Sequence, residues 1–160
     1  MPPPANLEFL RRAIALATDN VLRGAGGPFG AVIVHDGRIV SEGVNTVTAT
    51  HDPTAHGEVN AIRAAAKALG RFSLAGCQLY SSCEPCPMCL AAAYWAQIDA
   101  IYYGASADDA ALAGFNDTFI YQEIRKNNVD RKFLPATQLL SEEAWASIAA
   151  WIASPNKTAY

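Results

Sequence analysis

The chain has 160 residues, of which 51% are hydrophobic and 17% charged, and its formal net charge is −3. This length and hydrophobic content predict one compact domain with a buried core and exclude an intrinsically disordered chain. The acidic balance lacks the basic surface of a protein that clamps a phosphate backbone, so it argues against a polynucleotide substrate.

Hydrophobic periodicity and turn residues predict helices and strands that alternate along the chain. In chain order they predict a helix over 6–23, a strand over 29–34, a hairpin turn at 36–37, a strand over 39–45, a loop over 46–55, a helix over 56–69, a strand over 77–81, a helix over 85–97, a strand over 100–104, a short helix over 117–127, a strand over 136–140 and a helix over 142–153. Pro85 is expected to open one helix and Ser141 to cap the last. The alternation indicates a single domain over 1–160, an α/β fold with a three-layer α/β/α sandwich and a mixed central sheet of about five strands covered by helices.

The cysteines point to a metal rather than to disulfides. The sequence holds no apolar stretch of the kind that forms a signal peptide or spans a membrane, so we expect a cytoplasmic protein. In a reducing compartment, three cysteines as close as Cys83, Cys86 and Cys89 are more typical of a metal site or of catalysis. Cys77 stands apart and is expected to be a small buried side chain.

Two segments carry metal-binding chemistry, one with His56 and Glu58 and the other with Cys86 and Cys89. Each lies at the start of a predicted helix, where the helix dipole favours a thiolate. Cysteines three positions apart share nearly the same helix face, so both reach one ion. A zinc ion with three protein ligands keeps one position for water and lowers the pKa of that water to about 7. Glu58 is then the candidate for moving the protons.

His-x-Glu followed by Pro-Cys-x-x-Cys is the known signature of zinc nucleobase deaminases. On these residues the chain resembles the cytidine deaminase-like superfamily, and within it the chain is similar to the small bacterial guanine deaminases. The segments that carry the resemblance are HGEVNAIR (56–63), SCEPCPMC (82–89), GFNDTFIY (114–121) and NKTAY (156–160).

The resemblance implies a cytidine deaminase-like fold, a zinc cofactor and the hydrolysis of guanine to xanthine and ammonia in purine catabolism or salvage. In that reaction zinc-bound hydroxide attacks C2 of the base while Glu58 shuttles protons. The implied partners are a purine base, water and a second copy of the chain in a homodimer, with no nucleic acid and no membrane.

The resemblance also implies the residues that bind the base. It places Phe29 at the wall of the base pocket and Asn45 at its polar edge, and Trp95 is a second candidate for the flat apolar slot that a purine needs. Asp117 would accept hydrogen bonds from the donors of guanine. The C-terminal helix and tail over 141–160, with Tyr160 at its end, would close an active site of the same or of a neighbouring subunit.

Simpler readings remain open. Cys83 as a fourth ligand would give a closed structural zinc site without catalysis, and His51 offers another imidazole at an offset that suits no helix. Each of the other candidates has a structural role to fill: a helix N-terminal acid for Glu58, a helix N-cap for Asp117, a strand-end turn residue for Asn45, core aromatics for Phe29 and Trp95, and a frayed chain end for Tyr160.

Alternative functions remain open in the same way. A tRNA adenosine deaminase shares both zinc motifs but should carry a basic surface for its RNA. A deaminase of another nucleobase, a nucleoside or a triazine uses the same chemistry. A zinc-stabilised binding module without catalysis is the alternative of another class.

Overall fold

The computed structural model describes residues 4–159, and the chain divides into two compact units that meet between Asp117 and Thr118. Within the described residues, the first unit has a four-stranded sheet in the order β2-β1-β3-β4. Its strands are β1 (Gly30–His35), β2 (Arg38–Val44), β3 (Cys77–Cys83) and β4 (Ala100–Ala105). β1 runs antiparallel to β2 and β3, whereas β3 and β4 are parallel, so the sheet is mixed as predicted.

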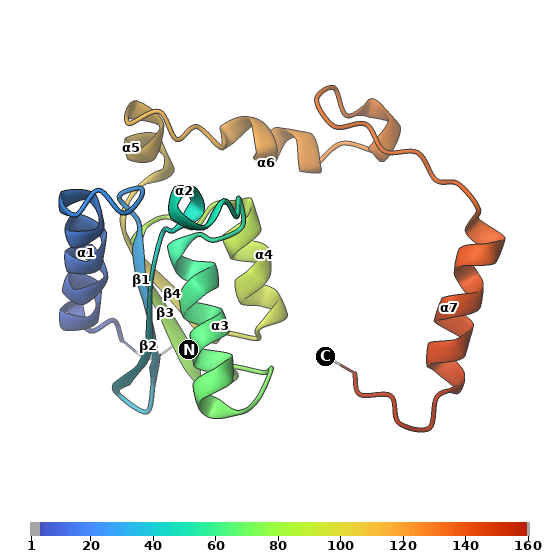
Figure 1. Ribbon diagram of the computed structural model, residues 1–160, viewed down its shortest axis with the longest axis horizontal. Helices are drawn as coiled ribbons and strands as arrows, with labels where there is room; N and C mark the ends of the chain where they lie inside the picture. Colours follow the sequence, from blue (N-terminus) through green and yellow to red (C-terminus); the bar gives the residue numbers. More distant parts are fainter. Residues whose placement is uncertain (1–3, 160) are drawn as a thin grey trace. The chain divides into compact units, whose positions relative to one another are not determined.

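Helices cover both faces of this sheet (Figure 1). α1 (Leu7–Leu22) packs on β1 and β3, and α3 (Gly57–Leu69) packs on the opposite face against β2, β1 and α4 (Pro87–Trp95). α4 is also the crossover that a parallel β3–β4 pair requires. The three-layer sandwich is therefore confirmed, with a short α2 (Val47–Thr50) inside the predicted loop and an unpredicted α5 (Ala107–Leu112) after β4.

β1 is buried on both faces because helices lie on each side of it. Ala31 and Ile33 pack in the cluster formed with α3 and α4, whereas Val32 and Val34 pack with Tyr80 beneath α1. This two-sided burial explains why the strand reads as a continuous apolar run rather than as an alternation. The first unit thus has a core on each side of its sheet.

Local turn and cap residues set the element ends. Asp36 and Gly37 have positive φ angles of 49° and 70°, the conformation of a tight two-residue hairpin, which confirms the predicted turn. Gly70 ends α3 in the left-handed conformation, also as predicted. The prediction for Pro85 was wrong: α4 begins at Pro87, and Cys86 is its N-cap. Pro87 occupies the first helical position, where the absence of a backbone N–H costs no hydrogen bond.

The second unit contains α6 (Thr118–Ile124), a 3-10 turn (Asn128–Asp130) and α7 (Ser141–Ala153). The carboxylate of Glu123 accepts hydrogen bonds from the backbone N–H groups of Lys132 and Phe133, at 2.8 and 3.2 Å. These bonds tie the segment after the 3-10 turn to α6. The predicted strand over 136–140 was wrong, because these residues find no strand partner and adopt no regular structure. Ser141 is the first residue of α7 rather than its cap, a position that Leu140 takes with a φ of 53°.

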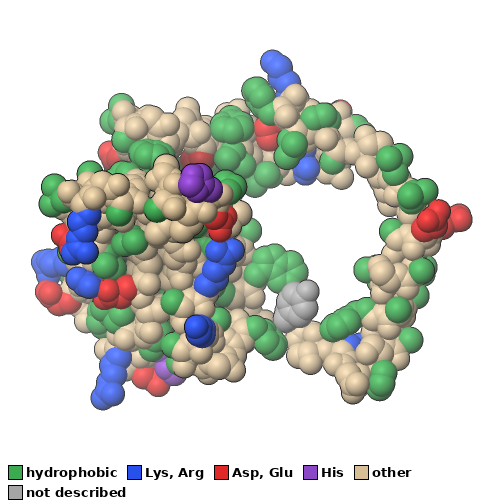
Figure 2. Space-filling model, in the orientation of Figure 1, with side chains coloured by type: hydrophobic (Ala, Val, Ile, Leu, Met, Phe, Trp, Pro, Cys, Tyr) green, Lys and Arg blue, Asp and Glu red, His purple; other side chains and the backbone are tan. Residues whose placement is uncertain are grey.

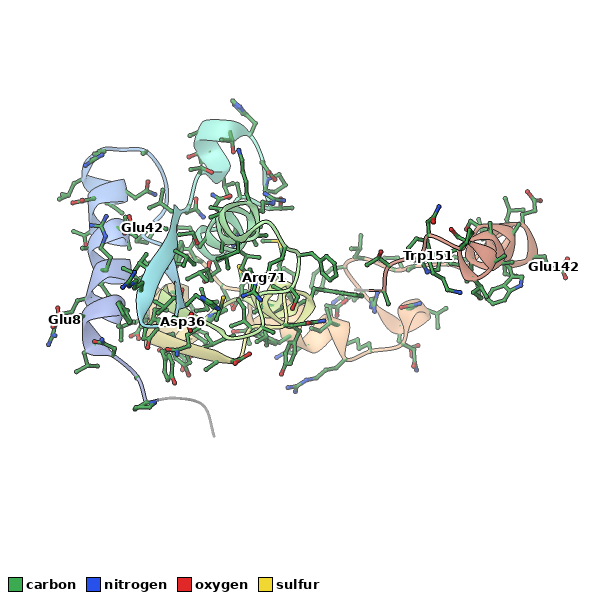
Figure 3. All side chains as sticks on the ribbon, turned by 90° about the horizontal axis from the view of Figure 1, so that it is seen from below. Glu8, Asp36, Glu42, Arg71, Glu142 and Trp151 are labelled. Atoms are coloured by element: carbon green, nitrogen blue, oxygen red, sulfur yellow. The ribbon has the colours of Figure 1, made fainter. Side chains whose placement is uncertain are left out.

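α7 carries large apolar side chains that this unit leaves exposed, and Figure 2 shows such side chains along the segment. They are Trp145, Ile148, Trp151 and Ile152. Figure 3 labels Trp151 on the helix. Among the described residues, no helix is both long and apolar enough to cross a membrane.

Candidate active site and metal centre

One cavity of about 670 Å³ in the first unit is lined by most of the residues that were predicted to form the site. Four stretches line it, within 24–29, 45–58, 83–86 and 107–117. The stretches come from the loop after α1, the segment between β2 and α3, the turn between β3 and α4, and the segment after β4. Residues far apart in the sequence thus meet at the ends of the strands and at the starts of α3 and α4.

Close backbone packing brings the start of α3 to this place. A Cβ atom on Gly43 of β2 would lie 2.2 Å from the Gly57 carbonyl oxygen and 2.5 Å from the Ala61 nitrogen, so only glycine allows the helix to lie this near the strand. At Gly57 itself a Cβ atom would come within 3.1 Å of the carbonyl oxygen of Phe29. His56, the N-cap of α3, is therefore held against the strand ends.

Three side chains form a group that can hold a metal ion: His56, Cys86 and Cys89, from the starts of α3 and α4. The Nδ1 atom of His56 lies 3.5 Å from each sulfur, and the two sulfurs are 3.6 Å apart. Bond lengths of about 2.3 Å to sulfur and 2.0–2.1 Å to nitrogen give a tetrahedral zinc ion donors separated by about 3.6–3.8 Å. The group therefore fits zinc in both chemistry and spacing.

The two cysteines are hydrogen-bonded to each other. The contact between their sulfur atoms, together with His56, lowers the pKa of the Cys86 thiol to about 4. The same bond and burial raise the pKa of Cys89. Because zinc binds thiolates, occupation of the site releases protons and weakens in acid.

Cys83 lies outside this donor group. Burial raises the pKa of its thiol to about 11, and the thiol donates a weak hydrogen bond to the carbonyl oxygen of Ser106, at 3.5 Å. His51 is exposed, with a φ of 53°, and also lies outside the group. Among the described residues the geometry therefore favours a three-ligand site with one open position over a closed four-ligand site.

Glu58 is buried beside the donors, with 4% of its surface exposed. Its Oε1 atom accepts a hydrogen bond from the Ser81 hydroxyl at 3.0 Å, and its Oε2 atom lies 3.5 Å from the Cys89 sulfur. Burial raises the pKa of the Glu58 carboxyl above its ordinary value. A carboxyl held in this way can exchange a proton with a molecule in the cavity.

Phe29, Asn45 and Asp117 line the same cavity as two of the donors, His56 and Cys86. The ring of Phe29 meets that of Phe115 edge to face, with centroids 4.9 Å apart, so two aromatic rings shape one wall. Asn45 is buried, and partial burial raises the pKa of Asp117. These three predicted substrate residues are thus brought together with the predicted metal ligands.

Two other predicted substrate residues, Trp95 and Tyr160, are not among the described residues that line the cavity. Trp95 does not line the cavity: it ends α4, is 67% exposed and follows Cys89 by six residues, about 9 Å along a helix axis. The helix that brings Cys89 to the site thus carries Trp95 away from it. Tyr160 lies outside the described residues.

The lining residues that sequence reasoning missed include Phe115 and Glu84. The Glu84 carboxylate accepts a hydrogen bond from the Ala107 N–H at 3.1 Å and so anchors the start of α5. Both residues lie inside the motif segments 82–89 and 114–121, so their position in the sequence was the available signal.

Comparison with known proteins gives a consistent result. Residues 4–105 match the family described as the cytidine and deoxycytidylate deaminase zinc-binding region. A guanine deaminase of Bacillus subtilis (strain 168) is 53% identical over 152 residues, which cover 95% of this chain and 97% of that protein. An X-ray structure of guanine deaminase from Bacillus subtilis superposes with a TM-score of 0.93 at 52% identity, over 98% of this chain and 99% of that one. A tRNA-specific adenosine deaminase of Agrobacterium fabrum is 47% identical over 78 residues, 49% of this chain and 51% of that protein.

Proposed function

The chain belongs to the cytidine and deoxycytidylate deaminase zinc-binding family, and from this premise we propose that it is a zinc-dependent hydrolase that converts guanine to xanthine and ammonia. One observation carries the proposal: two of the metal donors, His56 and Cys86, line one cavity with a buried carboxyl and an aromatic wall, and the third donor, Cys89, lies 3.6 Å from the Cys86 sulfur. The similarity to the Bacillus guanine deaminase over nearly the whole of both chains supports the choice of base.

His56, Cys86 and Cys89 would hold the zinc ion. When bound, zinc supplies a Lewis acid that brings the pKa of a water molecule in its open position close to neutrality. The two thiolates and the imidazole would supply three of the four ligands that zinc takes, so this donor set would leave one position for that water.

Glu58 moves the protons in the proposed reaction. Water adds to C2 of guanine, so that a C–O bond forms, the C–N bond to the amino group breaks and ammonia leaves. The Glu58 carboxylate accepts one proton from the water and donates it to a ring nitrogen. It then accepts the second proton from the new C2 hydroxyl and donates it to the leaving amine. The hydrogen bond from Ser81 fixes one oxygen of this carboxylate, so the other is oriented for transfer.

Phe29, Asn45 and Asp117 bind the base in the proposed complex. The Phe29 ring offers a flat apolar surface to the purine. The Oδ1 atom of Asn45 accepts from the Val47 N–H at 3.3 Å, which leaves the Asn45 Nδ2 group for acceptors on the base. The carboxylate of Asp117 accepts from the N–H groups of guanine.

The charge of the cavity favours a neutral base over a phosphorylated substrate. Among the described residues that line the cavity, none is lysine or arginine, whereas three are carboxylates, namely Glu58, Glu84 and Asp117. A phosphate group would be repelled there, and RNA binding depends on basic contacts. We therefore do not favour deamination of a tRNA.

We further propose that the chain acts in the cytoplasm as a homodimer of single deaminase domains. The four cysteines are free thiols, as expected in a reducing compartment. The exposed apolar residues of α7 suit a partner surface, and the tail beyond this helix, with Tyr160, would close an active site of the same or of the neighbouring subunit. Truncation before Asn156 should then reduce guanine turnover, and an unchanged rate would exclude a closing role.

The decisive experiment measures ammonia released by the zinc-loaded full chain. The substrates are guanine, adenine, cytosine, their nucleosides and a tRNA hairpin. We expect release from guanine. Release from the hairpin instead would make the chain a tRNA deaminase, and no release from any of them by a zinc-loaded protein would make it a binding module.

A further inference from the structure

The main chain around Asn45 is held by two asparagines that do not line the cavity. The Asn45 N–H donates to the carbonyl oxygen of Phe29 at 2.9 Å. The Asn45 carbonyl oxygen accepts from the Nδ2 atom of Asn20 in α1, at 2.9 Å. The carbonyl oxygen of Val44, one residue earlier, accepts from the Nδ2 atom of Asn60 in α3, also at 2.9 Å. Asn45 is therefore fixed from both faces of the sheet.

Asn20 connects two walls of the cavity. Only 5% of its surface is exposed, and its Nδ2 atom donates a second hydrogen bond, of 2.9 Å, to the carbonyl oxygen of Gly27. A Cβ atom on Gly26 would lie 2.2 Å from the Asn45 carbonyl oxygen and 2.9 Å from this nitrogen, so the loop passes directly over the contact. Since only the nitrogen of a carboxamide can donate to two carbonyls, the orientation of the Asn20 side chain is unambiguous.

Asn60 holds the segment after Asn45 through hydrogen bonds from its side-chain amide. Besides Val44, its Nδ2 atom donates to the Thr46 hydroxyl at 3.1 Å and to the Ala55 carbonyl oxygen at 3.3 Å. The Thr46 N–H closes the segment by donating to the same Ala55 oxygen, at 3.0 Å. Asn60 thus ties both ends of the loop that carries α2 to the end of β2.

We propose that Asn20 and Asn60 are positioning residues that fix the direction of the Asn45 side-chain amide and thereby set the affinity for the base. A donor adds affinity only when it points at its acceptor, and the strength of a hydrogen bond falls steeply with angle. Both asparagines act through Asn45 and touch no substrate. The inference rests on the proposed function, in which Asn45 binds the base.

A double-mutant cycle tests the inference. Asn20→Ala, Asn45→Ala and the double variant are compared in zinc-loaded full-length protein, by kcat and KM for guanine and by competitive inhibition with hypoxanthine, a guanine analogue without the reacting amino group. Loss of one well-directed hydrogen bond corresponds to about tenfold in affinity, so Asn20→Ala should raise KM and the inhibition constant about tenfold while kcat changes less than about threefold. In the Asn45→Ala background the same change should alter both constants by less than about twofold.

Two further variants separate positioning from general stability. Asn60→Ala should give the same non-additive pattern with Asn45→Ala, and it serves in place of Asn20→Ala if that variant does not fold. Ser41→Ala is the matched control, because the Ser41 hydroxyl donates to the Ala61 carbonyl oxygen at 2.7 Å but does not line the cavity. It should lower the melting temperature and leave KM unchanged.

Equal losses in both Asn45 backgrounds would overturn the inference, since they would show a purely structural role for the two asparagines. An unmodified chain that releases no ammonia from guanine would instead overturn the proposed function. The two failures are therefore distinguished by the activity of the unmodified protein.

Discussion

The two sides of the cavity are built in different ways. On the metal side, His56, Cys86 and Cys89 come from the starts of two helices, and two short sequence motifs identify them. On the side that would bind the base, Phe29 and Asn45 come from a loop and a strand end that are held by long-range hydrogen bonds. Short motifs therefore specify the reacting groups, whereas tertiary contacts specify the fit to the base. Changes on the metal side should therefore abolish the reaction, and changes on the other side should alter it by degrees.

The strongest test of the metal side removes its ligands. Cys86→Ala or Cys89→Ala should each abolish zinc binding and guanine turnover, because two remaining donors cannot replace the tetrahedral set. Zinc content by atomic emission and ammonia release measure the effect. Cys83→Ala is the matched control and should keep one zinc ion per chain. Equal zinc loss in all three variants would show a four-ligand site and contradict the assignment.

Glu58→Gln separates metal binding from proton transfer. The amide keeps the shape of the side chain but cannot accept the proton, so kcat should fall by a factor of about 10²–10⁴ while zinc content stays unchanged. Steady-state kinetics with guanine and zinc analysis of the same preparation give both quantities. Near-normal turnover would remove Glu58 from the mechanism.

A change on the other side of the cavity should be milder. Asn45→Ala removes one donor to the base and should lower kcat/KM for guanine by about 10–100-fold, without loss of zinc. Steady-state kinetics and zinc analysis measure both. If kcat/KM stayed within twofold of the parent value, Asn45 would be a turn residue only. The proposed difference between the metal side and the side that would bind the base would then be wrong.

The smallest effect is expected for an ion pair away from both sides. Arg12 of α1 donates two hydrogen bonds of 2.7 Å to Glu42, which lies on β2 beside α1 in Figure 3. These bonds lower the pKa of the Glu42 carboxyl below its ordinary value of 4.5. The pair therefore stabilises the fold above that pH, and the contribution is lost as pH falls through the lowered pKa.

Arg12→Ala tests this sign. Because both side chains are partly exposed, the variant should cost about 1 kcal/mol or less at neutral pH. The difference in melting temperature from the parent should shrink below pH 4.5, and KM for guanine should not change. A difference that grew in acid would contradict the assignment.

Most elements of the first unit could be predicted because their signals are local. The hairpin at Asp36 and Gly37 and the glycine that ends α3 need only the conformation of one or two residues. The metal donors follow from motif spacing in the same way. The start of α4 was misplaced because two prolines, Pro85 and Pro87, both suit a first helical turn, and only the structure shows which one takes it.

The features that the sequence did not predict are those that depend on tertiary contacts. The segment over 136–140 was predicted to be a strand, but a strand needs a partner, and none pairs with it among the described residues. Trp95 is an aromatic at the end of the helix that carries Cys89; it does not line the cavity, and its role in binding the base stays a prediction. Asn20 and Asn60 gave no signal, because a buried amide reveals its acceptors only when remote carbonyls are placed beside it.

The order of the strands also bears on how the protein is made. His56 and Cys89 are 33 positions apart, and they meet only once β3 has inserted beside β1. The hairpin of β1 and β2 and the helix after it leave the ribosome first, and they depend on short-range contacts. During synthesis the three metal donors are therefore complete only once residue 89 has been made, after the β1–β2 hairpin and α3 but before β4. The ion that these donors would hold thus has no role in forming the first hairpin, and it would tie α3 to α4 before the last strand joins the sheet.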